Sequence, residues 1–457
     1  MQNSSSRRDF LKSAIAAPAV ATVFSRFITS ASAKGIQFDN GSELIPIQDQ
    51  TTGLPLLRLR EGFQYQSFGW VGDEMSDGVI TPEGHDGMGV ISQKGDILTL
   101  CRNHEIYGSK SFGPEALTYD PKAGGGCANL QFDLKAGKWL KSWTSLAGTV
   151  QNCAGGPTPW GSWLSCEETV LGPKGSFRGV QYQHEKHHGW VFEVPSEGKA
   201  SLEPLVALGR FVHEALAVDP HDGIIYETED RDTAGFYRFL PNEREVLSKG
   251  GNLQMLKVKG KDDLRTGAKR GVRYEAEWVD IEDPLRRDTP GKEDGLGVYS
   301  QGKEKGGTTF GRLEGCWFGD GVVYFNCTNG GEAGLGQVWS FSPRDQTLQL
   351  VFQSTSHDIL DSPDNLTVSP RGGLILCEDA DLKPLRLHAL SRKGILKTVA
   401  INNIQLKKGQ HNQLEGDFTG GEWAGACFSP DGKWLFVNIH KPGITFAITG
   451  PWDELGV

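Results

Sequence analysis

One hairpin pattern occurs six times along the chain, and this repetition limits the fold more than any other feature. Each copy has an apolar strand, a turn with Gly, Pro or Asp, and a second apolar strand. The copies are HDGMGVISQKGDILTLCRNHE (85–105), CAGGPTPWGSWLSCEE (153–168), HEALAVDPHDGIIYETED (213–230), EGCWFGDGVVYFNCTNGG (314–331), DNLTVSPRGGLILCEDA (364–380) and EWAGACFSPDGKWLFVNIH (422–440). Further short strands lie between them. Evenly spaced short strands are typical of all-β folds, and six copies favour a six-bladed β-propeller.

The composition agrees with this fold class. The chain has 457 residues with 60 glycines and 22 prolines, which suits one large all-β domain with many tight turns. We expect this single propeller domain to cover 34–457. The longest interval between strand pairs, 241–308, is rich in Lys, Gly and Asp. It predicts an inserted excursion, either as solvated surface or as a lid over a site.

Residues with metal-binding side chains lie at both ends of these hairpins. The first strands begin near Asp86, Cys153, Glu214, Glu314, Asp364 and Glu422, and the second strands end near Glu105, Glu168, Glu229, Asn329, Asp379 and Asn438. Four hairpins share one interval, since 168 − 153, 229 − 214, 329 − 314 and 379 − 364 all equal 15. The two ends of an antiparallel hairpin meet at the same edge of a sheet. We therefore expect these side chains to gather around one mouth of the propeller channel.

Acids and amides also occur at strand ends as turn formers, which is the alternative explanation for the pattern. A ring of carboxylates without cations would be costly, because like charges repel strongly where water is scarce. Carboxylate and amide oxygens suit calcium. Cys153 adds one thiolate, and ferric iron accepts thiolate and carboxylate together. The ligand set therefore leaves two options open, a mixed iron and calcium site or a site with calcium alone. We expect His85, His104 and His213 to be neighbours of the ring rather than ligands.

Three further polar residues are candidates for contact with substrate. Arg312 lies two positions before Glu314, so both side chains face the same side of a strand. An arginine there can hold a phosphate or a carboxylate through two hydrogen bonds, or it can pair with a ring carboxylate. Asn103 in RNHE and Asn129 in GGGCANL are the other candidates, as donors to an anion, and ordinary turns are the alternative explanation of both motifs.

The N-terminus has the features of an export signal. Arg7 and Arg8 precede a short apolar run, and small residues end it at Ala33. This order fits a twin-arginine signal peptide over 1–33, cut after Ala33, with delivery to the periplasm or outside. The apolar run is too short for a membrane span in the mature form. The net charge of −10 argues against nucleic acid as a partner.

Together, several motifs resemble the PhoX-type alkaline phosphatases, as a compact member. The matching stretches are RNHE, GGCANL, NCAGGPTPWGSWLSCEE, VHEA, YETED, FGRLEG, DSPDNLTVSPRG and FSPDGKWLFVNIHKPG, and they extend over nearly the whole mature chain. This resemblance implies six blades, twin-arginine export, and hydrolysis of phosphate monoesters with iron and calcium at the channel mouth.

The same resemblance implies roles for individual residues. Cys153, Glu168 and Glu214 would bind iron. Glu229, Glu314 and Asp364 would hold calcium or bridge metals, and Asn365 and Glu422 would be further ligands. Arg312 would hold the phosphate, and the metals would neutralise the phosphoryl oxygens.

Three functions follow as hypotheses. The first is a periplasmic phosphatase that hydrolyses phosphate monoesters, or diesters, of small molecules. The second is a calcium-dependent propeller hydrolase of the lactonase type, which has no use for Cys153. The third is a propeller that binds a partner without catalysis, which has no need of a charged ring.

Overall fold

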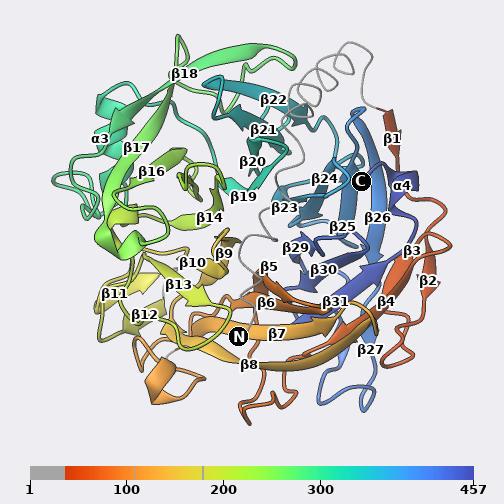
Figure 1. Cartoon of the computed structure of the whole chain (residues 1–457). Coiled ribbons are helices and arrows are strands. Elements are labelled where there is room, and N and C mark those ends of the chain that lie inside the picture. Colours follow the sequence, from red (N-terminus) through yellow and green to blue (C-terminus); the bar gives the residue numbers. More distant parts are fainter. Residues whose placement is uncertain (1–36, 109, 178–179) are drawn as a thin grey trace, which may run out of the picture.

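Six blades of β-strands are arranged around a central axis (Figure 1), in the computed structural model that describes residues 37–108, 110–177 and 180–457. The expected signal peptide, 1–33, lies outside the described residues. The innermost strands contact one another in the closed order β5–β9–β14–β19–β23–β29–β5. Because this order is that of the chain, each hairpin repeat begins one blade, and the expectation of a six-bladed propeller is confirmed.

The first three blades follow one another along the chain. The first contains β5 (His85–Lys94), β6 (Ile97–His104), β7 (Gly125–Asp133) and β8 (Lys138–Thr149). The second contains β9 (Asn152–Pro157), β10 (Ser162–Glu167) and β13 (Val191–Pro195), with the hairpin β11 (Lys174–Phe177) and β12 (Val180–Gln183) inserted. The third contains β14 (His213–Val218), β15 (Ile225–Glu229), β16 (Tyr237–Pro241) and β17 (Gly251–Val258).

The other three blades complete the circle. The fourth contains β19 (Leu313–Gly319), β20 (Val322–Cys327), β21 (Gln337–Ser342) and β22 (Thr347–Gln353). The fifth contains β23 (Pro363–Val368), β24 (Leu374–Glu378), β25 (Arg386–Leu390) and β26 (Ile395–Asn402), extended by β1 (Gln37–Asp39), β2 (Ile45–Ile47) and β3 (Leu57–Leu59). The sixth contains β29 (Trp423–Phe428), β30 (Trp434–Ile439) and β31 (Ile444–Thr449). A separate hairpin joins β27 (Gln405–Leu406) to β28 (Gly416–Asp417).

The sixth blade is closed by a strand from near the other end of the chain. Strand β4 (Gln64–Phe68) pairs antiparallel with β31, with Phe68 opposite Thr445 and Gln64 opposite Thr449. The last blade is thus built from both ends of the described chain. Its ladder of hydrogen bonds fixes the ring against opening at that seam.

The apolar core lies between neighbouring blades. Phe132 and Trp139 of the first blade pack on Trp434 and Phe436 of the sixth, and the Phe132 ring lies 5.0 Å from each of these two rings. Several of these contacts are edge-to-face, the arrangement that aromatic quadrupoles favour. This packing holds the inner strands in fixed positions around the axis.

The expected excursion at 241–308 leaves the third blade and reaches the fourth. Strand β18 (Arg273–Asp280) pairs with β17 on one side and with β22 on the other, so the third and fourth blades share one sheet. Helix α3 (Gly297–Glu304) follows. A short helix, α4 (Trp452–Leu455), comes after the last strand. The excursion therefore forms outer structure of two blades, and its segment 287–296 approaches the channel mouth, as shown below.

Candidate metal centre

Five of the six blades carry the same β-bulge at the start of the inner strand. In each, two residues of the inner strand lie opposite one residue of the second strand. The first bulge residues are Asp86, Cys153, Glu214, Glu314 and Asp364. A bulge turns a side chain out of the regular alternation of the strand. All five of these side chains line one cavity at the channel mouth.

Small residues after the bulge allow the blades to approach closely. A Cβ atom on Gly87 would lie 2.5 Å from the Cα of Ala154 in the second blade, and one on Gly315 would lie 2.7 Å from the main-chain nitrogen of Leu366 in the fifth. Larger side chains would push these inner strands apart. The pairs Asp86–Gly87 and Glu314–Gly315 thus place an acid in the mouth and a close contact behind it.

The sixth blade departs from this pattern. Gly425 occupies the bulge position, with a φ of +61°, and a Cβ there would lie 2.3 Å from the carbonyl oxygen of Asp86. The acid of this blade is Glu422, which precedes β29 and still lines the cavity. All six residues expected at the first strand ends therefore meet in the mouth.

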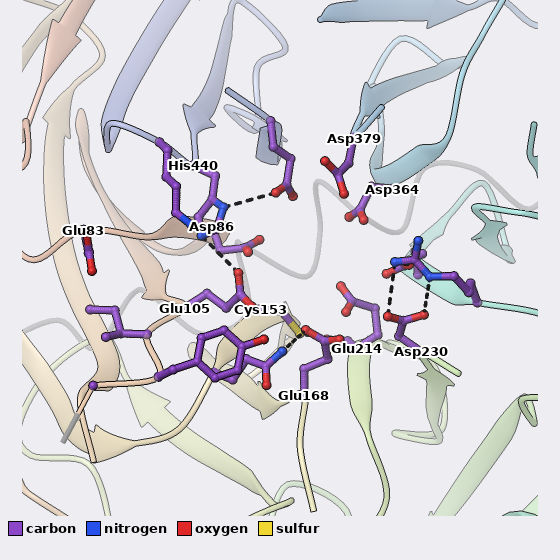
Figure 2. Close-up of a pocket in the computed structure, with 18 residues that line it drawn as sticks. Glu83, Asp86, Glu105, Cys153, Glu168, Glu214, Asp230, Asp364, Asp379 and His440 are labelled. Carbon is purple, nitrogen blue, oxygen red and sulfur yellow. Dashed lines mark hydrogen bonds and ion pairs between the residues drawn. The ribbon is translucent and has the colours of Figure 1, made fainter. Parts of the chain in front are cut away.

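A second set of side chains comes from the residue directly after the second strand. Glu105, Glu168, Asp230, Asp379 and His440 follow β6, β10, β15, β24 and β30, and each lines the cavity. Figure 2 shows these acids turned toward the space that Asp86, Cys153, Glu214 and Asp364 also face. Each blade thus supplies one residue from each end of its inner hairpin, except that the second residue is missing in the fourth blade.

The structure corrects the position expected for Glu229. This residue is the last of β15 and points into its own blade, where its Oε2 accepts hydrogen bonds from the Gly235 N–H at 2.9 Å and the Tyr237 hydroxyl at 2.7 Å. Asp230 lines the mouth instead. The expectation assumed a constant interval of 15 residues, but the turn of each hairpin has its own length. What is constant is the register, in which the first residue past the paired strand enters the mouth.

Asn103, Asn129 and Asn365 are not among the residues that line this cavity, which corrects their expected positions. Asn103 is buried behind it and donates from Nδ2 to the carbonyl oxygens of Cys153 at 3.2 Å and Ala154 at 2.7 Å. Asn129 donates to the carbonyl oxygen of Pro195 at 3.2 Å. Asn365 is the second bulge residue of the fifth blade.

The bond from Asn103 to the next blade has counterparts elsewhere in the ring. Thr228 donates to the carbonyl oxygen of Glu314 at 2.7 Å, and Asn326 to that of Asp364 at 2.8 Å. Asn438 donates to that of Asp86 at 2.5 Å. Side chains of the second strands therefore hold the main chain of the ring residues in the following blade. This explains the polar residues in otherwise apolar strands, and it gives Asn103 and Asn438 a role between blades in place of the roles expected at the mouth.

The cavity has a volume of about 580 Å³ and strongly acidic walls. Ten carboxyl groups line it, against the fixed positive charges of Arg312 and Lys441. Four groups of side chains could each hold a metal ion: Cys153–Glu168–Glu214, Glu214–Glu314–Asp364, Asp364–Asp379–Glu422 and Asp86–Glu105–His440. Glu214 and Asp364 each belong to two of the groups. Such shared carboxylates suit adjacent metal ions that they bridge.

The acid–base properties of the ring fit the binding of cations. Burial is the main cause that raises the pKa of Glu214 well above its usual value, and the charges of Glu314 and Asp364 add to it. The charge of Glu422 and burial raise the pKa of Asp379 to about 7. The carboxylates of Glu214 and Asp364 accept no hydrogen bond from any described residue. Cations placed among these groups would displace the protons and supply the missing partners.

Cys153 fits the same interpretation. Its side chain is buried at the mouth, and burial together with the charges of Glu214 and Glu168 raises the pKa of the thiol. A thiolate would form there only beside a strong positive charge. All eight cysteines are buried and free. Cys153 alone among them lines the cavity.

Arg312 lies at the mouth, as expected, and it already pairs with two ring acids. Its Nε lies 3.0 Å from Asp230 Oδ1, and its Nη2 lies 2.8 Å from Glu314 Oε1. Burial lowers the pKa of Arg312, but the charges of Glu314 and Asp230 outweigh it and raise the pKa. Nη1 makes no hydrogen bond to any described residue. This edge of the guanidinium group is therefore available to an anion in the cavity.

His440 is a site residue that the sequence analysis missed. It lies between two acids, with Nε2 3.0 Å from Glu105 and Nδ1 3.2 Å from Glu422. Burial opposes its protonation, but these two acids raise its pKa well above the usual value. The signal was present in the sequence, because His440 comes directly after the last hairpin's second strand, as Glu168 does in its own hairpin.

A second cavity of about 540 Å³ adjoins the first. Both share Glu168, Asp230 and Arg312 in their walls. The second cavity adds Arg231 and Arg287, the latter from the excursion. Its wall also contains Asp232, Glu293 and Asp294, so this second cavity has mixed charge and is less acidic than the ring beside it.

The chain was compared with protein families, with curated proteins and with solved structures. A family model described as alkaline phosphatase PhoX matches residues 42–143 and 131–443. A search of curated proteins gives no significant match. None of the helices among the described residues has the length and apolar character needed to cross a membrane.

Some solved structures are similar to this chain, with low sequence identity and low TM-scores. A gluconolactonase from Xanthomonas campestris is 15% identical, with 81% of this chain and 96% of that one covered and a TM-score of 0.36. A putative 6-phosphogluconolactonase from Bacteroides fragilis is 12% identical, with 83% of each chain covered and a TM-score of 0.35. The WD40 β-propeller domain of Doa1 is 9% identical, with 85% and 98% covered and a TM-score of 0.39.

Proposed function

The chain belongs to the PhoX family of alkaline phosphatases, and on this basis we propose that it hydrolyses phosphate monoesters, or diesters, at metal ions bound in the channel mouth. The observation that carries the proposal is the chain of overlapping ligand groups joined by Glu214 and Asp364. A small phosphorylated molecule is the substrate class that such a site suits.

We propose that the metals are iron and calcium. Cys153, Glu168 and Glu214 form the group with a thiol, which suits ferric iron. The groups around Glu314, Asp364, Asp379 and Glu422 offer carboxylate oxygens, which suit calcium. When bound, the metal ions would neutralise the phosphoryl oxygens and activate the attacking oxygen.

The protein's own side chains would bind and orient the ester. Arg312 is held in place by Asp230 and Glu314, and its Nη1 edge would donate to a phosphoryl oxygen. Because the guanidinium group is already fixed, little conformational entropy is lost when substrate binds. His440, held between Glu105 and Glu422, would carry a proton at the other side of the mouth.

The adjoining cavity would receive the group that phosphate is esterified to. It shares Arg312 with the mouth and has Arg231 and Arg287 in its wall. The same wall also carries carboxyl groups, among them Asp232 and Asp294. The arginines would pair with an anionic or hydrogen-bond-accepting group of the organic part.

We further propose export by the twin-arginine machinery and action in the periplasm or outside the cell. Arg7, Arg8 and the apolar run before Ala33 support this. Replacement of both arginines by lysine should leave the uncut protein inside the cell. Cell fractionation would test this, and export of the double variant at the normal rate would contradict it.

The catalytic proposal is tested with purified protein supplied with iron and calcium. We expect phosphate release from an aryl phosphate at alkaline pH and no hydrolysis of a sugar lactone. Hydrolysis of the lactone, with no phosphate release by protein of full metal content, would overturn the proposal in favour of the lactonase hypothesis. Absence of both activities would favour a binding propeller.

A further inference from the structure

A second cluster of metal-binding side chains lies behind the mouth, outside the cavity. Asp120, His184 and His188 each offer one ligand atom, and these atoms lie within 4.8 Å of one another. Asp120 lies in the connection between β6 and β7, and the two histidines lie in the connection between β12 and β13. All three side chains are buried.

The neighbours of His184 turn an unpaired nitrogen toward the cluster. His184 Nδ1 lies 3.0 Å from the carbonyl oxygen of Lys122. A carbonyl oxygen only accepts, so Nδ1 carries the proton and Nε2 has a free lone pair. That Nε2 is buried and has no hydrogen-bond partner. A buried acceptor without a partner costs free energy unless something binds it.

His188 is oriented in the same way by a carboxylate. Its Nδ1 lies 2.7 Å from Glu167 Oε1, and its Nε2 lies 3.4 Å from Asp120 Oδ2. When Nδ1 donates to Glu167, the lone pair of Nε2 faces the carboxylate of Asp120, which repels it. Either a proton or a metal ion between them would remove this repulsion. A carboxylate behind a metal-bound histidine is a common arrangement in zinc sites.

The third ligand is held rigidly. The carboxylate of Asp120 accepts hydrogen bonds from the main-chain N–H groups of Lys122, Glu185 and Lys186, at 2.7 to 2.8 Å. Two ligand atoms at about 2.0–2.2 Å from a tetrahedral zinc ion lie about 3.4 Å apart. The separation of 3.4 Å between His188 Nε2 and Asp120 Oδ2 equals this spacing.

We propose that Asp120, His184 and His188 bind a zinc ion, separate from the metals of the mouth. Two imidazoles and one carboxylate suit zinc, with water as the fourth ligand. The ion would tie the β6–β7 connection to the inserted β11–β12 hairpin. It would also be linked to the mouth through Glu167, which directly precedes Glu168 and accepts a hydrogen bond from His188 Nδ1.

The test compares zinc binding in the full-length protein, the variant His184→Gln and the matched control His187→Gln. His187 is an exposed neighbour outside the cluster. Zinc retained after dialysis is measured by elemental analysis. We expect the wild type and His187→Gln to keep one zinc ion per chain. His184→Gln should bind zinc more than about 100-fold more weakly, because loss of even a hydrogen-bond partner of a ligand lowers metal affinity about 10–100-fold. Equal zinc content in all three proteins would overturn the proposal.

A second measurement does not depend on the folding of a variant. X-ray absorption at the zinc edge of the wild-type protein should show two imidazole ligands and no sulfur. Sulfur in the spectrum would place the zinc at Cys153, and a wild-type protein that retains no zinc would show that a proton on His188 fills the site. Either result would overturn the proposal. Zinc that is retained by Glu214→Gln would confirm that the site is separate from the mouth.

Discussion

The side-chain amide of Asn326 donates a hydrogen bond of 2.8 Å to the main-chain carbonyl of Asp364, across the boundary between the fourth and fifth blades. Both groups are buried. Asp364 belongs to two of the candidate metal-binding groups. This bond is therefore one of those that link the packing of blades to the geometry of the mouth, and it can be tested.

Replacement of Asn326 by alanine should destabilise the protein by about 1–3 kcal/mol, because it leaves the buried carbonyl of Asp364 without a donor. It should also weaken metal binding at the mouth. Urea unfolding and metal titration would measure the two effects. Asn403 makes the same type of bond at an exposed position, to Pro55. The control Asn403→Ala should cost less than about 1 kcal/mol and leave metal binding unchanged, and equal effects for both variants would argue against the link.

Replacement of Glu214 by glutamine should have the largest effect of any single ring acid, because this residue is shared by two groups. We expect loss of metal and a fall in phosphate release of at least about 100-fold, the size of effect seen when a charge-stabilising group is removed. The control Glu229→Gln changes an acid outside the mouth. It should lower stability and leave the metal content unchanged. Loss of metal with unchanged stability would mean that Glu229 rather than Asp230 faces the metals.

Removal of the metals should make stability depend on pH. The pKa of Asp379 is raised to about 7 in the folded protein, from an ordinary value of 3.8. The folded protein without metals therefore binds this proton more tightly than the unfolded chain does. Its free energy of unfolding should be greatest below about pH 4 and fall as the pH rises through 7, by up to about 1.4 kcal/mol per pH unit for each such group.

Thermal unfolding of protein treated with a chelator would measure this dependence. The unfolding temperature should fall between pH 5 and 8, on the same basis. Added calcium should restore it at pH 8, since cations displace the protons. An unfolding temperature that rises over this range in the absence of metals would contradict the interpretation of the ring.

Arg287→Ala should reduce the preference for esters with a charged organic part. Both Arg287 and its neighbour Arg286 pair with an acid, Asp288 and Asp283 respectively, but only Arg287 lines the cavity beside the mouth. We expect the KM for such esters to rise about tenfold, the worth of one charge-assisted hydrogen bond. The KM for an uncharged aryl phosphate should not change. If Arg286→Ala has the same effect, the adjoining cavity is not the binding site for this group.

The sequence predicted the propeller, all six ring residues at the first strands and three of the five at the second strands, for a physical reason. Hairpin repeats reflect local strand pairing. One register position of that pairing is shared by Asp86, Cys153, Glu214, Glu314 and Asp364. A sequence with six such hairpins has few ways to bury its apolar strands.

The rest of the ring depends on details that spacing does not reveal. From first to second ring residue, the intervals 86 to 105, 153 to 168, 214 to 230 and 364 to 379 are 19, 15, 16 and 15. Turn lengths differ, so a constant interval selected Glu229 in place of Asp230. Asn103 was expected to donate to substrate. Its actual acceptors are carbonyl oxygens of the next blade, about 50 residues away in the sequence, which spacing does not reveal. The cluster of Asp120, His184 and His188 joins two distant connections, for which the sequence has no short pattern.

Elemental analysis of the purified, exported protein tests the central claim most directly. We expect iron and calcium at whole-number ratios to the chain, with a visible thiolate-to-iron absorption band. The variant Cys153→Ser should lose the band and the iron and retain calcium. Protein that contains neither metal at a near-stoichiometric level, or a Cys153→Ser variant with unchanged iron, would contradict a thiolate-bound iron and calcium centre at the channel mouth.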